Sequence, residues 1–315
     1  MEEDMEGGRS VSTDLKFWRE KERLKDEIVD CLTAIITTRG CAWNRCYMCS
    51  YARESRQVSE KELIEQIDAV FKNKAKVYKI FTSGSFFDDS ELPKFVREYV
   101  ARKFKEVGAE KLIVESRPEF IEEDKLSIFE DINLEVGIGL ESADDFIREK
   151  CVNKGFKFED FLIASKKLKS FGFRVKAYLL LKPPFLSEKE AVEDALNSIK
   201  KIESIADVVS LNLTNVQKNT LVEKLWYAGL YRPPWLWSAI EVLRKSDLDI
   251  ICDPVAAGKS RGPHNCYSCD LEVAKAIRNF SLTQDKSYLE VYCECKRKWE
   301  VAIELENYSR IPIFF

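Results

Sequence analysis

The chain has 315 residues, of which 45% are hydrophobic, and a formal net charge of −4, so it can bury the core of one large α/β domain with a small appendix. This slightly negative net charge argues against strong non-specific binding of nucleic acid over the whole surface. Since no apolar run could span a bilayer and residues 1–9 lack a signal-peptide core, we expect a cytoplasmic protein whose ten cysteines are metal ligands and reduced thiols.

The first predicted element is an amphipathic helix at residues 14–25, within an N-terminal segment of residues 1–30, because apolar and charged residues alternate there at helical spacing. From residue 31, strands and helices alternate. Short apolar runs predict six strands, at residues 34–38, 77–82, 111–115, 134–140, 173–181 and 206–213. Amphipathic stretches predict the helices between them, at residues 60–71, 91–104, 122–129, 158–171 and 188–202.

Strict alternation of strands and helices requires parallel pairing with right-handed crossovers. Six units are fewer than the eight of a closed barrel, so residues 31–218 are predicted to form a partial (β/α)6 barrel, open on one side. The alternation stops near residue 219. Residues 219–315 are therefore assigned to a C-terminal domain, with helices at 221–229, 237–245 and 270–280.

Three cysteines, Cys41, Cys46 and Cys49, lie in the loop after the first barrel strand. Thiolates bind iron–sulfur clusters, and three of them would leave one iron of a 4Fe–4S cluster open for a substrate or cofactor. A zinc site would need a fourth ligand close by, and a disulfide would leave the third cysteine unpaired. We expect a catalytic 4Fe–4S cluster here, with zinc and unliganded thiols as the alternatives.

The ends of the next strands suit a small ligand. The second strand is followed by Ser83, Gly84, Ser85 and Phe86. Glycine there lets the backbone approach a ligand closely, and a tight turn without a ligand explains the pattern about as well. The third strand ends at Glu115 and the fourth runs into Glu141, whose carboxylate could bind a ribose hydroxyl or an ammonium group. Because ligands gather at the C-terminal ends of parallel strands, these residues predict a cofactor site.

The C-terminal domain contains four cysteines with the spacing of a structural zinc site: Cys266, Cys269, Cys293 and Cys295. Cys252 or His264 could replace one of these ligands. Buried thiols and a second iron–sulfur cluster are the alternatives to zinc. Cys31 and Cys151, by contrast, are expected to be buried as small hydrophobic residues.

A local basic patch is expected in the same domain, from Lys259, Arg261 and residues 296–298. It could bind RNA phosphates, or it could simply be solvated surface. His264, the only histidine, could be a base, a metal ligand or an RNA contact.

The motif of Cys41, Cys46 and Cys49 resembles the cluster motif of the radical S-adenosylmethionine (SAM) superfamily. Residues 115–119 and 137–142 are similar to strands of the subgroup that contains the Elongator catalytic subunit and the tRNA methylthiotransferases. More closely, five stretches resemble the radical-SAM subunits of archaeosine synthase: residues 39–51, 212–217, 231–237, 253–255 and 261–266.

Three features depart from the commonest pattern of the superfamily. Four residues rather than three separate Cys41 from Cys46. Met48 stands where an aromatic residue usually lies beside the adenine, and we assign it to the cofactor site. Residues 83–85 replace a Gly-Gly-Glu-like run, so ammonium binding there would depend on backbone carbonyls and hydroxyls.

The resemblance implies that the reduced cluster passes an electron to SAM on the open iron, giving a 5′-deoxyadenosyl radical that takes hydrogen from the substrate. In the resembled family the substrate is tRNA with a lysine adduct of 7-cyano-7-deazaguanine at position 15, and a lyase-type C–N cleavage of the lysine moiety leaves archaeosine. The implied partners are a lysine-adding, transglycosylase-like subunit and an electron donor.

Two other functions are alternatives to archaeosine synthesis. One is a tRNA-modifying radical enzyme of the Elongator or methylthiotransferase type, although the chain after the barrel is too short for the acetyl-transfer domain of Elongator. The other is a zinc-ribbon RNA-binding adaptor whose barrel cluster is merely structural.

Overall fold

The computed structural model describes residues 15–25 and 27–313, and its centre is one eight-stranded sheet with strand order β1 to β8. The strands are β1 (Lys16–Leu24), β2 (Glu27–Ile35), β3 (Val77–Phe81), β4 (Lys111–Ser116), β5 (Leu134–Glu141), β6 (Arg174–Leu181), β7 (Val208–Leu213) and β8 (Ile250–Ile251). Strands β2 to β8 run parallel to one another, and β1 pairs with β2 in the antiparallel direction.

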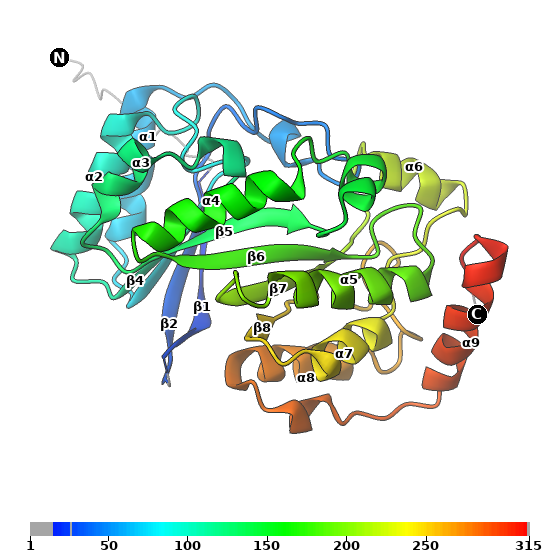
Figure 1. The fold of residues 1–315 in the computed structure, drawn as a ribbon. Coiled ribbons are helices and arrows are strands. Elements are labelled where there is room, and N and C mark those ends of the chain that lie inside the picture. The colour runs from blue at the N-terminus through cyan, green and yellow to red at the C-terminus, as the bar shows by residue number, and fades with distance from the viewer. Residues whose placement is uncertain (1–14, 26, 314–315) are drawn as a thin grey trace, which may run out of the picture.

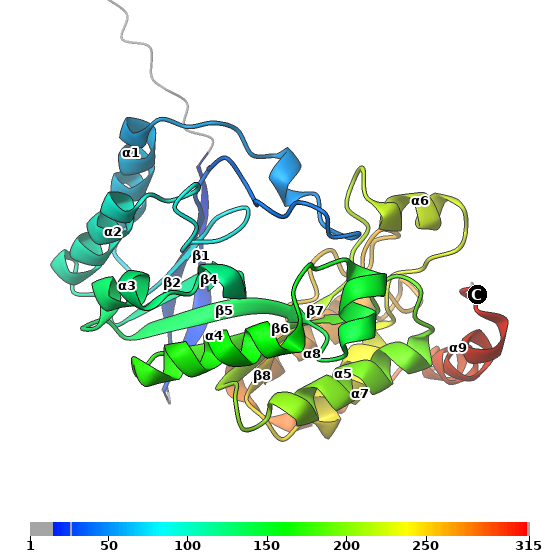
Figure 2. The same cartoon turned by 45° about the horizontal axis from the view of Figure 1, so that its top comes forward.

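Helices cover the outer face of the curled sheet (Figures 1 and 2). The α-helices are α1 (Glu60–Phe71), α2 (Lys94–Glu106), α3 (Glu123–Leu126), α4 (Phe158–Ser170), α5 (Glu188–Ile202), α6 (Leu221–Tyr227), α7 (Leu236–Lys245), α8 (Asp270–Thr283) and α9 (Lys296–Ser309). Short 3₁₀ turns are η1 (Tyr51–Arg53), η2 (Pro118–Phe120), η3 (Ser127–Phe129) and η5 (Lys286–Leu289), and η4 (Ile147–Val152) is a π-helix. The predicted α/β partial barrel is confirmed, since β2 to β7 are its six strands.

Local sequence signals explain where the barrel helices begin. Ser59 caps α1, because its hydroxyl accepts a hydrogen bond from the Glu62 amide (3.2 Å). Ser187 and Glu190 form a reciprocal capping box at the start of α5. Each helix then buries an apolar stripe against the outer face of the sheet, where a single hydrophobic core extends from Leu32 to Ala302.

The predicted N-terminal helix is wrong within the described residues, because residues 16–24 form strand β1. The strand forms a hairpin with β2, in which Lys16 pairs with Ile35 and Leu24 with Glu27. The alternate acidic residues Glu20 and Glu22 point into the barrel and bind the buried Lys79 of β3 (2.6 and 2.5 Å). This long-range ion pairing, which no local pattern reveals, favours the strand.

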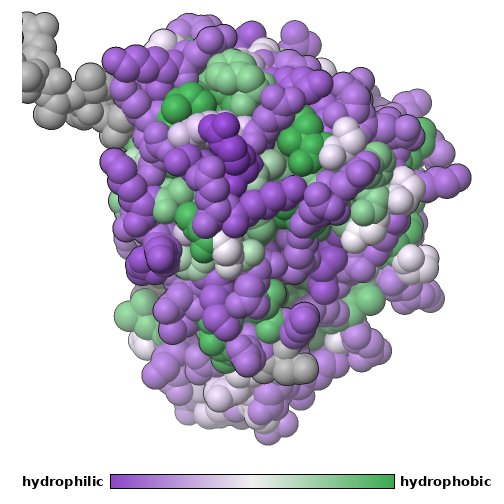
Figure 3. Space-filling view, turned by 90° about the vertical axis from the view of Figure 1, so that its left-hand side faces the viewer, coloured by the Kyte–Doolittle hydropathy of each residue, from purple (hydrophilic) through white to green (hydrophobic). Residues whose placement is uncertain are grey.

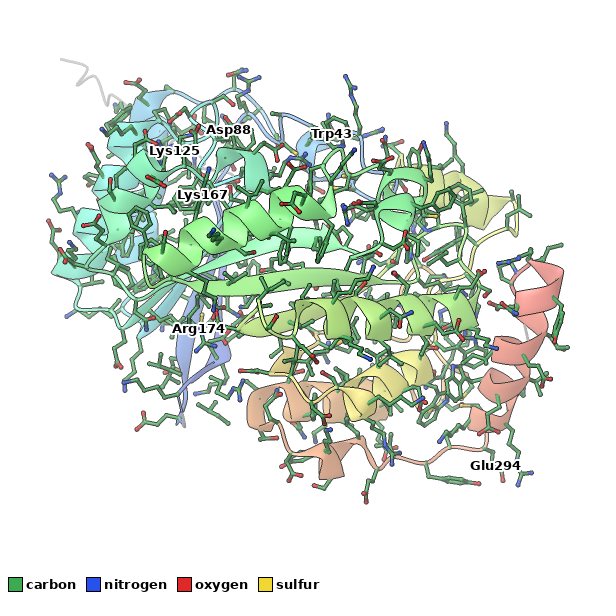
Figure 4. All side chains as sticks on the ribbon, viewed as in Figure 1. Trp43, Asp88, Lys125, Lys167, Arg174 and Glu294 are labelled. Carbon is green, nitrogen blue, oxygen red and sulfur yellow. The ribbon has the colours of Figure 1, made fainter. Side chains whose placement is uncertain are left out.

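A second group of ion pairs crosses the barrel interior at Glu135 of β5. Its carboxylate is bound by Lys176 (2.5 Å), Lys111 (2.8 Å) and Arg174 (3.4 Å), the last of which is labelled in Figure 4. Burial alone would raise the pKa of Glu135, but these cations outweigh it and lower the pKa to about 2. Side chains therefore fill the barrel at the N-terminal ends of its strands, which leaves the C-terminal ends for a ligand.

The C-terminal residues continue the same core rather than forming a separate one. Strand β8 pairs with β7, helix α7 packs on α5 and α8, and α9 packs on α5. The proposed boundary near residue 218 stays a prediction. Helix α9 and strand β8 were not predicted from the sequence.

No helix in residues 15–25 and 27–313 is long and apolar enough to cross a membrane. The face in Figure 3, on the left-hand side of Figure 1, is largely hydrophilic with scattered hydrophobic residues.

Candidate active site and a second cysteine cluster

The loop between β2 and α1, residues 36–59, contains the first three cysteines, and we call it the cysteine loop. It leaves the sheet at the C-terminal end of β2, and Cys41, Cys46 and Cys49 are all half-buried. Gly84, after β3, lies directly against it, because a Cβ at residue 84 would be only 2.5 Å from the Cα of Cys41. A side chain at residue 84 would therefore displace the first cysteine.

Backbone hydrogen bonds hold the cysteine loop on both sides of Tyr47. The Tyr47 amide donates to the carbonyl of Val152, at the end of the π-helix η4 (3.0 Å). The Tyr47 carbonyl accepts from the amides of Leu221 and Val222 in α6 (3.1 and 3.3 Å). Figure 2 shows the loop reaching toward α6 beyond the strand ends. The thiols therefore sit on a backbone that the rest of the fold positions.

Gln217, after β7, holds the cysteine loop next to its third cysteine. Its side-chain oxygen accepts from both the amide and the hydroxyl of Ser50 (2.7 and 3.1 Å), next to Cys49. Met48 packs beside it against a small hydrophobic cluster formed with Val216, Val222 and Tyr231. One face of Met48 is thus used for packing against α6.

Glu141 and Lys154 form an ion pair beside Cys46. The Lys154 ammonium lies 2.5 Å from Oε1 of Glu141, which follows a register shift in β5 and has a left-handed φ of 65°. Burial alone would lower the pKa of Lys154, but Glu141 and Cys46 outweigh it and raise that pKa. Burial raises the pKa of Cys46 to about 11, and Lys154 opposes this rise. A buried cation therefore stands where it can stabilise a thiolate.

Arg117 adds a second cation at this edge. Its guanidinium carbon lies 5.4 Å from the ring centroid of Trp43, and its Nη1 donates to the carbonyl of Lys154 (2.9 Å). The indole N–H of Trp43 in turn donates to the carbonyl of Asn153 (2.7 Å). The end of β4, the end of η4 and the cysteine loop are thereby connected.

Glu115 lies deeper in the barrel, paired with a tyrosine. Burial raises the pKa of Glu115, while a hydrogen bond with the Tyr178 hydroxyl opposes the rise. The Tyr178 ring lies over Gly137, where a Cβ would come within 2.5 Å of it. Glycine at residue 137 therefore makes room for the tyrosine, which reaches the carboxylate from β6.

The turn after β3 is held by hydrogen bonds within the protein. The amide of Ser85 donates to the buried carboxylate of Glu91 (2.6 Å), which also accepts from the Thr38 hydroxyl (2.6 Å). The Phe86 ring is fully buried against Phe87 and Phe129. The Ser85 amide is thus already bound within the protein. The Phe86 amide donates to the Glu115 carbonyl (2.8 Å), so Phe86 could meet a ligand only through its own backbone carbonyl. Ser83 and Gly84 are half-buried.

The structure brings the four C-terminal cysteines together. Their sulfurs lie within 4.8 Å of one another, and Cys266–Cys269, Cys266–Cys293 and Cys269–Cys295 are 3.7, 3.9 and 3.6 Å apart. Sulfurs that share one tetrahedral ion are about 3.8 Å apart, since each lies about 2.3 Å from the metal. In a four-iron cluster each thiolate binds a different iron, which would need wider spacing. The geometry therefore fits a single metal ion.

Two side chains donate hydrogen bonds to these sulfurs. The indole N–H of Trp237 points to Cys295 (3.3 Å), and the amide nitrogen of Asn265 points to Cys269 (3.6 Å). Such donors stabilise the thiolate form that binds metal. Trp43 and Glu294, labelled at the top and the lower right of Figure 4, mark the two cysteine-containing segments, which are far apart.

The proposed substitute ligands lie outside this group of four. Nδ1 of His264 is 2.8 Å from the carbonyl of Gly262, and its ring stacks on Tyr267. Cys252 is buried, and its backbone is bound to the Ser281 hydroxyl (2.8 Å). Cys31 and Cys151 are buried, as predicted.

The residues of the expected basic patch differ in their surroundings. Arg261 is paired with Glu223 of α6 (2.5 Å), whereas Lys259 is exposed. Residues 296–298 begin α9, next to Cys295.

Three residues that shape the site were not predicted from the sequence: Lys154, Glu91 and Tyr178. Each is separated in sequence from the group that it contacts, and none lies in a motif. Glycines opposite them gave an indirect signal: Gly84 lies against Glu91, Gly137 against Tyr178 and Gly139 against Lys154.

Comparison with known proteins identifies the family. Residues 35–199 match the model of the radical SAM superfamily. The chain is 42% identical to archaeosine synthase subunit beta of Methanosarcina acetivorans, over 88% of this chain and 86% of that protein. It is 40% identical to archaeosine synthase subunit beta of Thermococcus kodakarensis, over 92% and 97% of the two chains.

Proposed function

Because this chain belongs to the radical SAM superfamily and, within it, to the archaeosine synthase beta subunits, we propose that it is a radical SAM enzyme of tRNA modification. Its substrate would be tRNA with a lysine adduct of 7-cyano-7-deazaguanine at position 15, and lyase-type cleavage of the lysine C–N bond would leave archaeosine. The observation that carries this proposal is the 42% identity over 88% of the chain.

We assign the 4Fe–4S cluster to Cys41, Cys46 and Cys49. Half-buried thiols on a fixed backbone, with the cations of Lys154 and Arg117 close by, suit a negatively charged cluster. When bound, the cluster would supply the electron that cleaves SAM to a 5′-deoxyadenosyl radical. The residues around it would exclude water and oxygen and hold the cofactor in place.

SAM would bind along the strand ends. Lys154 contacts Oε1 of Glu141, so we assign the other carboxylate oxygen to a hydroxyl or ammonium group of the cofactor. Three further groups complete the proposed site: the backbone carbonyls of residues 83–86, the half-buried face of Met48 and the Glu115 carboxylate.

For the second cluster we propose structural zinc on Cys266, Cys269, Cys293 and Cys295. Four thiolates in tetrahedral spacing form a closed site with no position for a substrate. We further propose that the protein works in the cytoplasm with an electron donor and a lysine-adding subunit.

The test of this function is anaerobic turnover. Reconstituted, reduced protein with SAM should convert lysine-modified tRNA to archaeosine-containing tRNA and form 5′-deoxyadenosine in step with it, both measured by mass spectrometry. The same tRNA without the lysine adduct is the control. Formation of 5′-deoxyadenosine with the lysine adduct left intact would contradict the proposed substrate.

Replacing Glu141 should weaken SAM binding. Glu141→Gln removes the charge but keeps the shape, and the loss of a charge-assisted contact costs about 1.5–3 kcal/mol, or roughly tenfold or more in the dissociation constant. Glu141→Ala should also lower the melting temperature, because it leaves the buried Lys154 ammonium unpaired.

The measurement is anaerobic equilibrium binding of SAM to the reconstituted protein. Glu54→Gln is the matched control, since Glu54 also lies in an ion pair of the cysteine loop, with Lys16, but is exposed. An unchanged dissociation constant for Glu141→Gln would place the cofactor elsewhere.

A further inference from the structure

The turn between β6 and α5 has an unusual backbone. Lys182 and Phe185 have left-handed φ values of 58° and 75°. A bulky residue is rarely found in that conformation, which persists only when its surroundings enforce it.

The base of this turn is enforced by buried contacts. The Lys182 ammonium is buried between the carboxylates of Glu188 (2.5 Å) and Glu306 of α9 (3.2 Å). The Lys182 carbonyl accepts a hydrogen bond from the Tyr231 hydroxyl (2.7 Å). These contacts fix the base of the turn at Lys182.

The tip of the turn presents an aromatic ring at the proposed active site. Phe185 is 54% exposed, although the next residue, Leu186, packs on the core. The Phe185 ring meets the Tyr47 ring edge-to-face, with centroids 6.4 Å apart, and Tyr47 lies between Cys46 and Met48. An apolar ring on a residue with a strained backbone is thus exposed to solvent beside the cysteine loop.

The exposed charge of the cysteine loop, which Phe185 contacts through Tyr47, suits a polyanion. Arg39, Arg45 and Arg53 of the cysteine loop are exposed, as is Lys218 after β7. Residues 39–53 contain no acidic side chain, and Glu54, which follows them, is paired with Lys16 (2.9 Å). An exposed aromatic ring in contact with a loop that carries exposed cations is an arrangement by which proteins bind single-stranded nucleic acid: the ring stacks on a base and the cations contact phosphates.

We propose that Phe185, supported by Tyr47, is a stacking platform for an unstacked RNA nucleobase at the mouth of the barrel. This inference rests on the proposed function, and it identifies how the substrate is held: an enzyme that acts on a base must take it out of the stack, and an aromatic ring compensates for the lost stacking. Phe185 is a positioning residue rather than a catalytic one.

The experiment measures anaerobic binding of lysine-modified tRNA to the reconstituted protein. Phe185→Ala should weaken binding about 5- to 150-fold, the range for losing one base–aromatic stack, and Phe185→Trp should restore it. Tyr288→Ala, which removes another exposed aromatic ring from η5 (41% exposed), should change nothing. Formation of 5′-deoxyadenosine without tRNA should be equal in all variants.

A tRNA with an abasic site at the modified position identifies the stacked base. It should bind the wild-type protein more weakly, and Phe185→Ala should cause little further loss. If Phe185→Ala binds modified tRNA as tightly as wild type, or weakens only the binding of a protein partner, the platform is ruled out. If wild type binds tRNA in a Phe185-dependent way but leaves the lysine adduct intact, the proposed reaction fails while the platform stands.

Discussion

Replacing Cys41, Cys46 and Cys49 together with alanine should abolish reductive cleavage of SAM and leave the protein folded. The thiols are only half-buried, and the cysteine loop is held by the backbone of Tyr47 and the amide of Ser50 rather than by sulfur contacts. Wild-type protein, reconstituted anaerobically, should carry about four iron atoms per chain on these ligands. The variant should lose that iron and form no 5′-deoxyadenosine above background.

Cys151→Ala is the matched control for this experiment. Cys151 lies in η4, beside the residue that binds the Tyr47 amide, but it is buried and is not an expected ligand. Its replacement should leave the iron content unchanged. Iron assay, chromatography of 5′-deoxyadenosine and circular dichroism together check the result. Continued 5′-deoxyadenosine formation by the triple variant would rule out the cluster assignment.

The barrel strands and helices were predictable because their signals are local. Strand β5 is a short apolar run, and helix α5 begins at a serine capping box and buries one stripe, so both lie at or within one residue of their predicted bounds. Each of these elements contains in its own residues the pattern that its position in the barrel requires.

Strand β1 was not predictable in this way. Leu15, just before the strand, and Trp18 and Leu24 within it have a helical spacing. The strand is favoured instead by pairing with β2 and by Lys79, which binds Glu20 and Glu22. Those partners lie up to 59 residues away. Tertiary contacts of this kind override local propensity.

The same distinction applies to the candidate site. Cysteine spacing identifies both cysteine-containing segments as candidate metal sites, because their cysteines are close together in the sequence. Lys154 beside Glu141, and Glu91 beneath Ser85, leave no such mark, since the fold alone brings them to the site. Lys154 pairs with a carboxylate and Glu91 accepts hydrogen bonds from two distant segments, and the sequence could not identify either contact.

Removing the C-terminal metal should disrupt the C-terminal helices and also weaken tRNA binding, before the barrel cluster is affected. The four sulfurs join the start of α8 to the start of α9. Helix α9 is then fixed by the indole N–H of Trp299, which donates to Ser238 (2.8 Å), and by Glu306, which binds Lys182 (3.2 Å). Since Lys182 anchors the turn that presents Phe185, loss of the metal would be transmitted to the proposed RNA platform.

Cys293→Ser and Cys295→Ser test this connection most directly. We expect about one zinc per chain in wild-type protein, retained when iron is removed, and loss of it in both variants. Amide exchange in α9 should rise, tRNA affinity should fall by at least the factor seen for Phe185→Ala, and 5′-deoxyadenosine formation without tRNA should persist. Cys252→Ala, a buried cysteine outside the group, should keep its zinc. Fully folded, active wild-type protein without zinc would show that α9 is held by its side-chain contacts alone.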